Sequence, residues 1–136
     1  MSRQGDSCFE IRLRNAEGIP IVQVVGNITR AALKNIKLTL ERLASAGHYH
    51  IVLNIESARN ANWRLLTGLA GAVRSIRQHY GDVDLVPSRE NIQELLQADR
   101  IARLFRISLS ERHAISRIKK LPRPPDKVSD TSARLK

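Results

Sequence analysis

The chain is predicted to fold as a single α/β domain whose mixed sheet starts with an antiparallel hairpin. Phe9, Ile11 and Leu13 alternate with charged residues, which is the period of a strand with one buried face. Turn residues at 15–18 and a β-branched apolar run at 19–25 complete the hairpin. The later apolar runs are separated by helix-length segments, and such crossovers make neighbouring strands parallel.

The remaining elements follow from helix caps, glycine stops and apolar periodicity. They are a helix from Thr29 to Gly47, a buried strand at 50–55, a helix from Asn62 to Gly81, a strand at 82–86, a helix at 88–98, a strand at 104–109 and a helix at 111–119 capped by Ser110. In the second helix, the stripe predicted to be buried is Leu66, Leu69, Val73, Ile76 and Tyr80.

Charge and composition divide the chain into a lead at 1–8, a domain at 9–119 and a basic tail at 120–136. The net charge is +10, and residues 117–136 hold seven basic and two acidic side chains, which gives +5. Half of the excess charge therefore lies at the C-terminal end of the chain, from Arg117 onward. Because the tail has three prolines and no periodicity, we expect it to be disordered.

The sequence contains no motif for a catalytic site, a metal site or a cofactor site. Cys8 is the single cysteine, and the four histidines lack the spacing of a zinc site. Neither a dinucleotide loop nor a phosphate-binding Gly-Lys-Ser/Thr occurs. The first residues lack the apolar run of a signal peptide and no stretch is long enough to span a membrane, so we expect a cytoplasmic protein. Because no catalytic motif is present, we also expect that it is not an enzyme.

Four short motifs stand in a recognisable order. They are Val-Gly-Asn-Ile-Thr at 25–29, Ile-Val-Leu-Asn-Ile at 51–55, Val-Asp-Leu-Val at 83–86 and Ser-Glu-Arg-His-Ala-Ile at 110–115. From about Phe9 to Ile118 the chain thereby resembles the STAS family, the sulphate-transporter and anti-sigma-factor-antagonist domains. The resemblance implies a STAS-like fold of four or five strands with about four helices, mainly on one face. It also implies a non-enzymatic regulator of signal transduction.

The family's switch is the feature in which this sequence departs from the resemblance. STAS regulators carry a loop of the form Asp-Ser-Ser-Gly-Leu-Gly, whose first Ser is phosphorylated by a partner kinase. Here the matching loop reads Asn62-Trp63-Arg64, so Trp63 stands at the phosphoacceptor position. An indole has no hydroxyl, which predicts a constitutive or scaffold-type binder. Thr67, and Ser57 in the preceding loop, are the alternative phosphorylation sites.

The start of the second helix is the predicted partner-binding surface. An exposed Trp63 beside Arg64 has the composition of a binding hot spot, although Trp63 could instead fold back onto the core. The small residues Gly68 and Gly71 permit either close approach of a partner or packing within the domain. The predicted partner-binding residues are Asn62, Trp63, Arg64, Thr67, Gly68 and Gly71.

The resemblance names the class of partner, and the basic tail leaves a rival open. The implied partner is an anti-sigma factor, a serine kinase or another STAS protein, in transcription regulation or a stress response, and a homodimer is also open. In the rival interpretation the tail binds nucleic acid through its charge. Its lack of aromatic side chains for base stacking, and its two acidic residues, count against that role.

Overall fold

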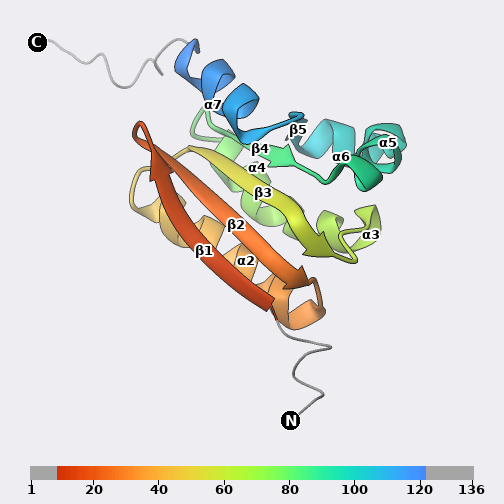
Figure 1. The fold of residues 1–136 in the computed structure, drawn as a ribbon. Coiled ribbons are helices and arrows are strands. Elements are labelled where there is room, and N and C mark those ends of the chain that lie inside the picture. The colour runs from red at the N-terminus through yellow and green to blue at the C-terminus, as the bar shows by residue number, and fades with distance from the viewer. Residues whose placement is uncertain (1–8, 122–136) are drawn as a thin grey trace, which may run out of the picture.

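The structure, a computed structural model, describes residues 9–121 and contains a five-stranded mixed sheet between two layers of helices (Figure 1). The strands lie in chain order: β1 pairs antiparallel with β2, and every later neighbour is parallel. The predicted mixed sheet with its antiparallel start is confirmed. The strands are β1 (Phe9–Ala16), β2 (Ile19–Asn27), β3 (His50–Arg59), β4 (Asp82–Val86) and β5 (Arg106–Ile107).

Most helices cover one face of the sheet, as predicted, and α7 covers the other (Figure 1). The predicted caps are present: the Thr29 side chain accepts from Ala32 N at 3.1 Å, and Ser110 from His113 N at 3.1 Å. The helices are α2 (Arg30–Ser45), α3 (Trp63–Leu66), the 3-10 helix η1 (Thr67–Leu69), α4 (Ala70–Arg77), α5 (Arg89–Gln97), α6 (Asp99–Leu104) and α7 (Glu111–Lys119).

The hairpin turn has the backbone that its sequence predicts. Glu17 and Gly18 have φ of 55° and 87°, the pair of positive angles that matches the twist of two strands joined by a tight turn. The Asn15 side chain accepts a hydrogen bond from Gly18 N at 3.0 Å. The prediction that Leu13 is buried is wrong, because β1 is the edge strand and Leu13 is 57% exposed.

The central strand β3 is longer than predicted. The apolar run ends at Ile55, but the backbone continues to pair with β2 as far as Arg59, which lies opposite Asn27. Ser57 consequently lies in a strand rather than in a loop. The hydropathy pattern does not predict this extension, because backbone hydrogen bonds hold it in the sheet while the side chains of Glu56, Ser57 and Arg59 are exposed.

The segment after α5 differs from its prediction. Leu104 belongs to α6, a helix that the sequence analysis missed, and the last strand is only Arg106–Ile107. Ile101 and Leu104, three residues apart, turn this short helix toward the core. Tyr80, predicted to be buried, is 66% exposed because α4 has already ended at Arg77.

Two apolar clusters fill the two sides of the sheet. The larger lies between the sheet and α2, α4, α5 and α6, and the smaller lies under α7. Because β3 is covered on both sides, residues 51–55 read as a continuous apolar run interrupted only by Asn54. The smaller cluster consists of Ile19, Ile21, Val52, Val86 and Ala114, with Ala16, Ile115 and Ile118 packed against it.

Charged side chains also attach α7 to the sheet. Arg117 forms an ion pair with Asp84, which is 1% exposed, and donates to the Ser108 hydroxyl at 3.2 Å. Burial raises the pKa of the Asp84 carboxyl above its ordinary value, while the hydrogen bond and charge of Arg117 act in the opposite direction. At the start of α7, Glu111 binds both Arg14 and Asn54. The smaller face therefore depends on pairing its buried polar groups.

Gly81 is required where the chain leaves α4 for β4. A Cβ built on Gly81 would lie 1.9 Å from the carbonyl oxygen of Tyr49, which no rearrangement of a side chain relieves. Gly81 is the predicted stop of the second helix, and the left-handed turn at that helix end is made by Tyr80, with φ of 63°. Glycine is needed here for close backbone approach rather than for its own backbone angles.

We expect Gly81→Ala to destabilise the domain by roughly 2 kcal/mol or more, because the new methyl group must push β4 away from Tyr49. Gly71→Ala is the matched control: it lies in α4 with no atom within 4 Å of the added methyl, and it should stabilise by about 0.5 kcal/mol. Urea unfolding measures both. Equal stability of the two variants would contradict the assignment.

We expect Arg117→Met to cost about 2 kcal/mol at neutral pH, because it leaves the buried Asp84 carboxylate unpaired. Without Arg117 the folded-state pKa of Asp84 rises further above its unfolded value. A raised carboxyl pKa contributes stability at low pH that is lost as the pH rises through it, so the deficit should shrink as the pH falls from 7 toward 5. Arg12→Met, at the exposed Arg12–Glu10 pair, should leave stability unchanged in the same urea titrations.

Candidate functional site

The predicted site lies at the carboxyl ends of the parallel strands β2 and β3, where the chain turns from β3 into α3 (Figure 1). In open α/β sheets this edge carries the loops on which binding sites are built. Asn60, with φ of 60°, makes the turn in a left-handed conformation that asparagine tolerates well. The turn therefore starts directly where the last paired residue of β3, Arg59, ends the sheet.

Hydrogen bonds from two sides hold this loop in place. The Ile28 amide donates to Arg59 O at 2.9 Å, and the Asn60 side chain binds that of Asn27. From α5, Asn91 Nδ2 donates to Ala61 O at 3.2 Å, and Ala61 is 1% exposed. The residues that follow are consequently presented from an ordered support, which lowers the entropy lost on binding.

The second helix begins at the predicted cap but is not continuous. The Asn62 side chain accepts from Leu65 N at 3.0 Å, with ψ of 160° at Asn62, as an N-cap requires. After four residues the chain tightens into η1, and the Thr67 hydroxyl donates to Arg64 O at 2.6 Å. The single helix predicted from Asn62 to Gly81 is therefore wrong, because the periodicity of apolar residues does not register a 3-10 turn.

Trp63 is partly buried, whereas the sequence analysis predicts it to be exposed. Its ring packs against the larger core cluster, and the Arg64 guanidinium lies over it at 5.4 Å from the ring centroid. The remaining indole surface lines an open cavity of about 430 Å³. The other lining residues are Glu94, Gln97, Ala98, Asp99 and Arg100.

The structure separates the other predicted site residues by environment. Thr67 is partly buried beside the arginines of α4 and α6. Gly68 is exposed, yet a Cβ there would lie 2.7 Å from Leu33 Cδ2, so its small size serves the approach of η1 to α2. Gly71 is exposed over open space. Ser57 is exposed on β3.

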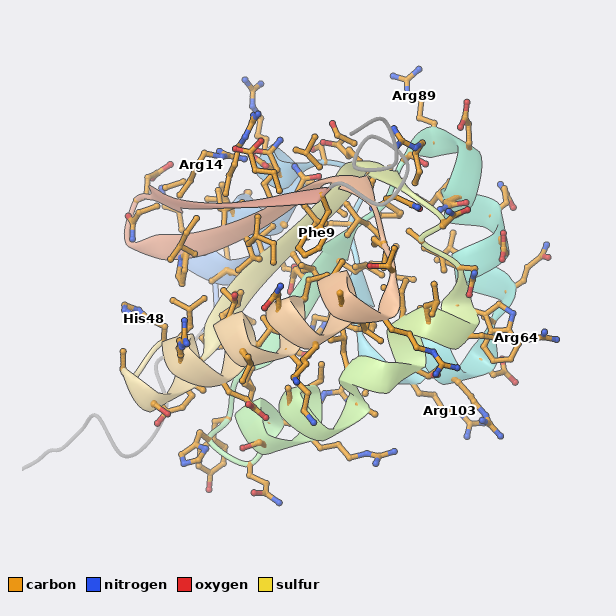
Figure 2. All side chains as sticks on the ribbon, turned by 90° about the horizontal axis from the view of Figure 1, so that it is seen from below. Phe9, Arg14, His48, Arg64, Arg89 and Arg103 are labelled. Carbon is orange, nitrogen blue, oxygen red and sulfur yellow. The ribbon has the colours of Figure 1, made fainter. Side chains whose placement is uncertain are left out.

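A basic groove beside this site was missed by the sequence analysis. It lies between α4 and α6 and is lined by Arg74, Arg77, Arg100 and Arg103. Figure 2 shows Arg64 and Arg103 on one side of the molecule, with His48 at the opposite end. The signal for α6 was present in the sequence as an acidic Asp99 in a first turn followed by apolar positions three apart.

Residues 9–121 contain neither a metal-binding cluster nor a membrane-spanning helix. No group of three His, Cys, Asp or Glu side chains there lies close enough to hold a metal ion. None of the helices in that range is both long and apolar enough to cross a bilayer. Cys8 and all but the first two residues of the predicted basic tail lie outside the described residues.

Comparison by sequence and by structure gives different results. No family model and no curated relative matches the sequence. An anti-sigma factor antagonist from Mycobacterium paratuberculosis superposes with a TM-score of 0.70 at 12% identity, over 82% of this chain and 95% of its own. The Bacillus cell fate determinant SpoIIAA, phosphorylated, gives 0.61 at 15%, over 80% and 99%. Unphosphorylated SpoIIAA gives 0.58 at 18%, over 82% and 100%.

We expect Asn62→Ala to lower the free energy of unfolding by about 1 kcal/mol, because the Leu65 amide loses its side-chain acceptor. Asn62→Asp keeps an acceptor at the same place and should stay within about 0.5 kcal/mol of the wild type. Chemical denaturation of the three proteins under one buffer measures the difference. A cap role is contradicted if alanine and aspartate behave alike.

Proposed function

We propose that this chain, which has the STAS-like fold of anti-sigma factor antagonists, is a non-enzymatic regulator that docks a protein partner through the start of α3. The observation that carries the proposal is the Trp63–Arg64 pair beside an open cavity at the carboxyl edge of the sheet. Tryptophan and arginine are the residues most enriched at the energetic centres of protein interfaces. The proposed contact residues are Asn62, Trp63, Arg64, Thr67, Gly68 and Gly71.

The packing of Trp63 favours a preorganised contact. Its ring is held between the core and Arg64, so little side-chain freedom is left to lose when a partner covers it. The cavity beside it is bounded by α5 and α6 and offers room for an apolar side chain from the partner. Arg64 is exposed and can form a charged contact at the rim.

Binding without the usual serine switch is part of the proposal. The residue after the Asn62 cap is Trp63, which has no hydroxyl to phosphorylate, and Asn62 itself is neutral. We therefore infer a constitutive or scaffold-type binder in partner switching. Its partner would be a kinase, an anti-sigma factor or another protein of the same fold, in the cytoplasm.

A second candidate, a phospho-switch at Thr67, is favoured by one observation. Thr67 lines the groove that holds four arginines, so a phosphate on its hydroxyl would find cations nearby. The same hydroxyl already donates to Arg64 O at 2.6 Å, and phosphorylation would break this bond at the end of α3. Ser57 is exposed on β3 and does not line this groove. Incubation with a cognate kinase followed by mass spectrometry distinguishes the two sites.

We expect Trp63→Ala and Arg64→Glu each to lose the same partner when tagged protein is used for quantitative pull-down from the source cell's lysate. Arg64→Glu is included because its side chain is exposed, so we expect this variant to stay folded, and circular dichroism checks that it does. Tyr80→Ala is the matched control: it removes an exposed aromatic ring beyond the other end of α4 and should retain the partner.

The partner identified in this way is then purified and its affinity is measured directly. We expect a loss of about tenfold or more for both site variants, which is the size of a hot-spot contribution. If both variants bind like the control, docking through the start of α3 is wrong. If only nucleic acid is captured, equally by every variant, the function belongs to the basic tail.

A further inference from the structure

The groove between α4 and α6 concentrates positive charge in a way that the docking site does not explain. It has a volume of about 540 Å³ and is lined by Arg74 and Arg77 from α4 and by Arg100 and Arg103 from α6. In each helix the two arginines are three residues apart and so lie on one face. The two basic faces therefore oppose each other across the groove.

Most of this charge is not neutralised by the described part of the protein. Arg77 Nε lies 3.3 Å from Asp82 Oδ1, but no hydrogen bond or ion pair to residues 9–121 is formed by the guanidinium groups of Arg74, Arg100 or Arg103. No carboxylate from residues 9–121 lines the groove. Like charges that face one another across a shallow groove repel, and this repulsion is removed when an anionic ligand binds.

The lining identifies the kind of anion. Thr67, Ala70 and Leu104 are the other described residues that line the groove, so its remaining surface is small or apolar, and none of these described residues offers an aromatic ring on which a base could stack. Guanidinium forks bind carboxylates through two parallel hydrogen bonds. An extended peptide with acidic side chains satisfies both features, because its backbone can lie over the apolar surfaces while its carboxylates reach the arginines.

The groove is also continuous with the docking site. Arg100 lines both the groove and the Trp63 cavity, and α6 contacts both α3 and α4. We propose that the groove binds an acidic segment of the protein partner, which continues from the Trp63 cavity along α4. This inference rests on the proposed docking function and adds the charge of the partner to it.

The test uses the full chain and a short fluorescein-labelled peptide rich in Glu and Asp, with binding measured by fluorescence anisotropy at low salt. The groove variant is Arg74→Glu/Arg103→Glu. Its matched control is Lys37→Glu/Arg112→Glu, which makes the same change of net charge at exposed positions on α2 and α7. Circular dichroism and thermal unfolding establish that both variants are folded.

We expect the groove variant to lose about tenfold or more in affinity for the acidic peptide and the control to lose about twofold, which is the share due to overall charge. The groove variant should also gain affinity for a Lys-rich peptide of equal length, since reversed charge reverses the preference. Equal losses in both variants would overturn the inference. So would a single-stranded oligonucleotide or inorganic phosphate that displaces the peptide at lower concentration.

Failure of this inference and failure of the docking function give different results. If the partner is lost in Trp63→Ala but the acidic peptide binds the groove variant normally, docking stands and the acidic segment is wrong. If the groove variant alone loses the acidic peptide while Trp63→Ala and Arg64→Glu keep their partner, the groove stands and docking through α3 is wrong.

Discussion

Burial of β3 on both faces is the constraint on which the rest of this structure depends. Its residues 51–55 are all at most 3% exposed, and the strand pairs in parallel with β2 and β4. Parallel pairing requires crossover helices, and those helices supply the larger covering layer, while α7, which follows the last strand, covers the other face. It also brings the carboxyl ends of β2 and β3 to one edge of the sheet. The loop before α3 can therefore be tied to both strands and to α5.

The two faces of the sheet reach burial by different means. The larger face is covered by apolar side chains from the helices α2 to α6, so its stability follows from the area removed from water. The smaller face has a single helix, and there Asp84, Asn54 and Ser108 are buried with Arg117 and Glu111 supplying partners. Removing one partner of a buried polar pair costs more free energy than replacing both partners by apolar residues. The helix α7 is therefore held in the position that keeps these pairs formed.

The proposed docking site and the basic groove are adjacent and have two kinds of chemistry. At the start of α3, Trp63 offers apolar area that is already ordered by the core and by Arg64. Along α4 and α6 the surface changes to guanidinium groups, and Arg100 belongs to both parts. An apolar anchor provides affinity, whereas charge complementarity chooses between partners and raises the rate of association. The geometry suits a partner with an apolar residue followed by an acidic segment.

The sequence by itself determined the mixed sheet, the hairpin turn at Glu17 and Gly18, and the caps at Thr29, Asn62 and Ser110, because each depends on local periodicity or one side chain. The tertiary structure alone decided the remaining features: the extension of β3, the 3-10 break after α3, the partial burial of Trp63 and the arginine groove. These depend on contacts between segments far apart in the chain. Hydropathy along a chain contains no record of which backbone pairs with a distant strand, or which arginines face each other across two helices.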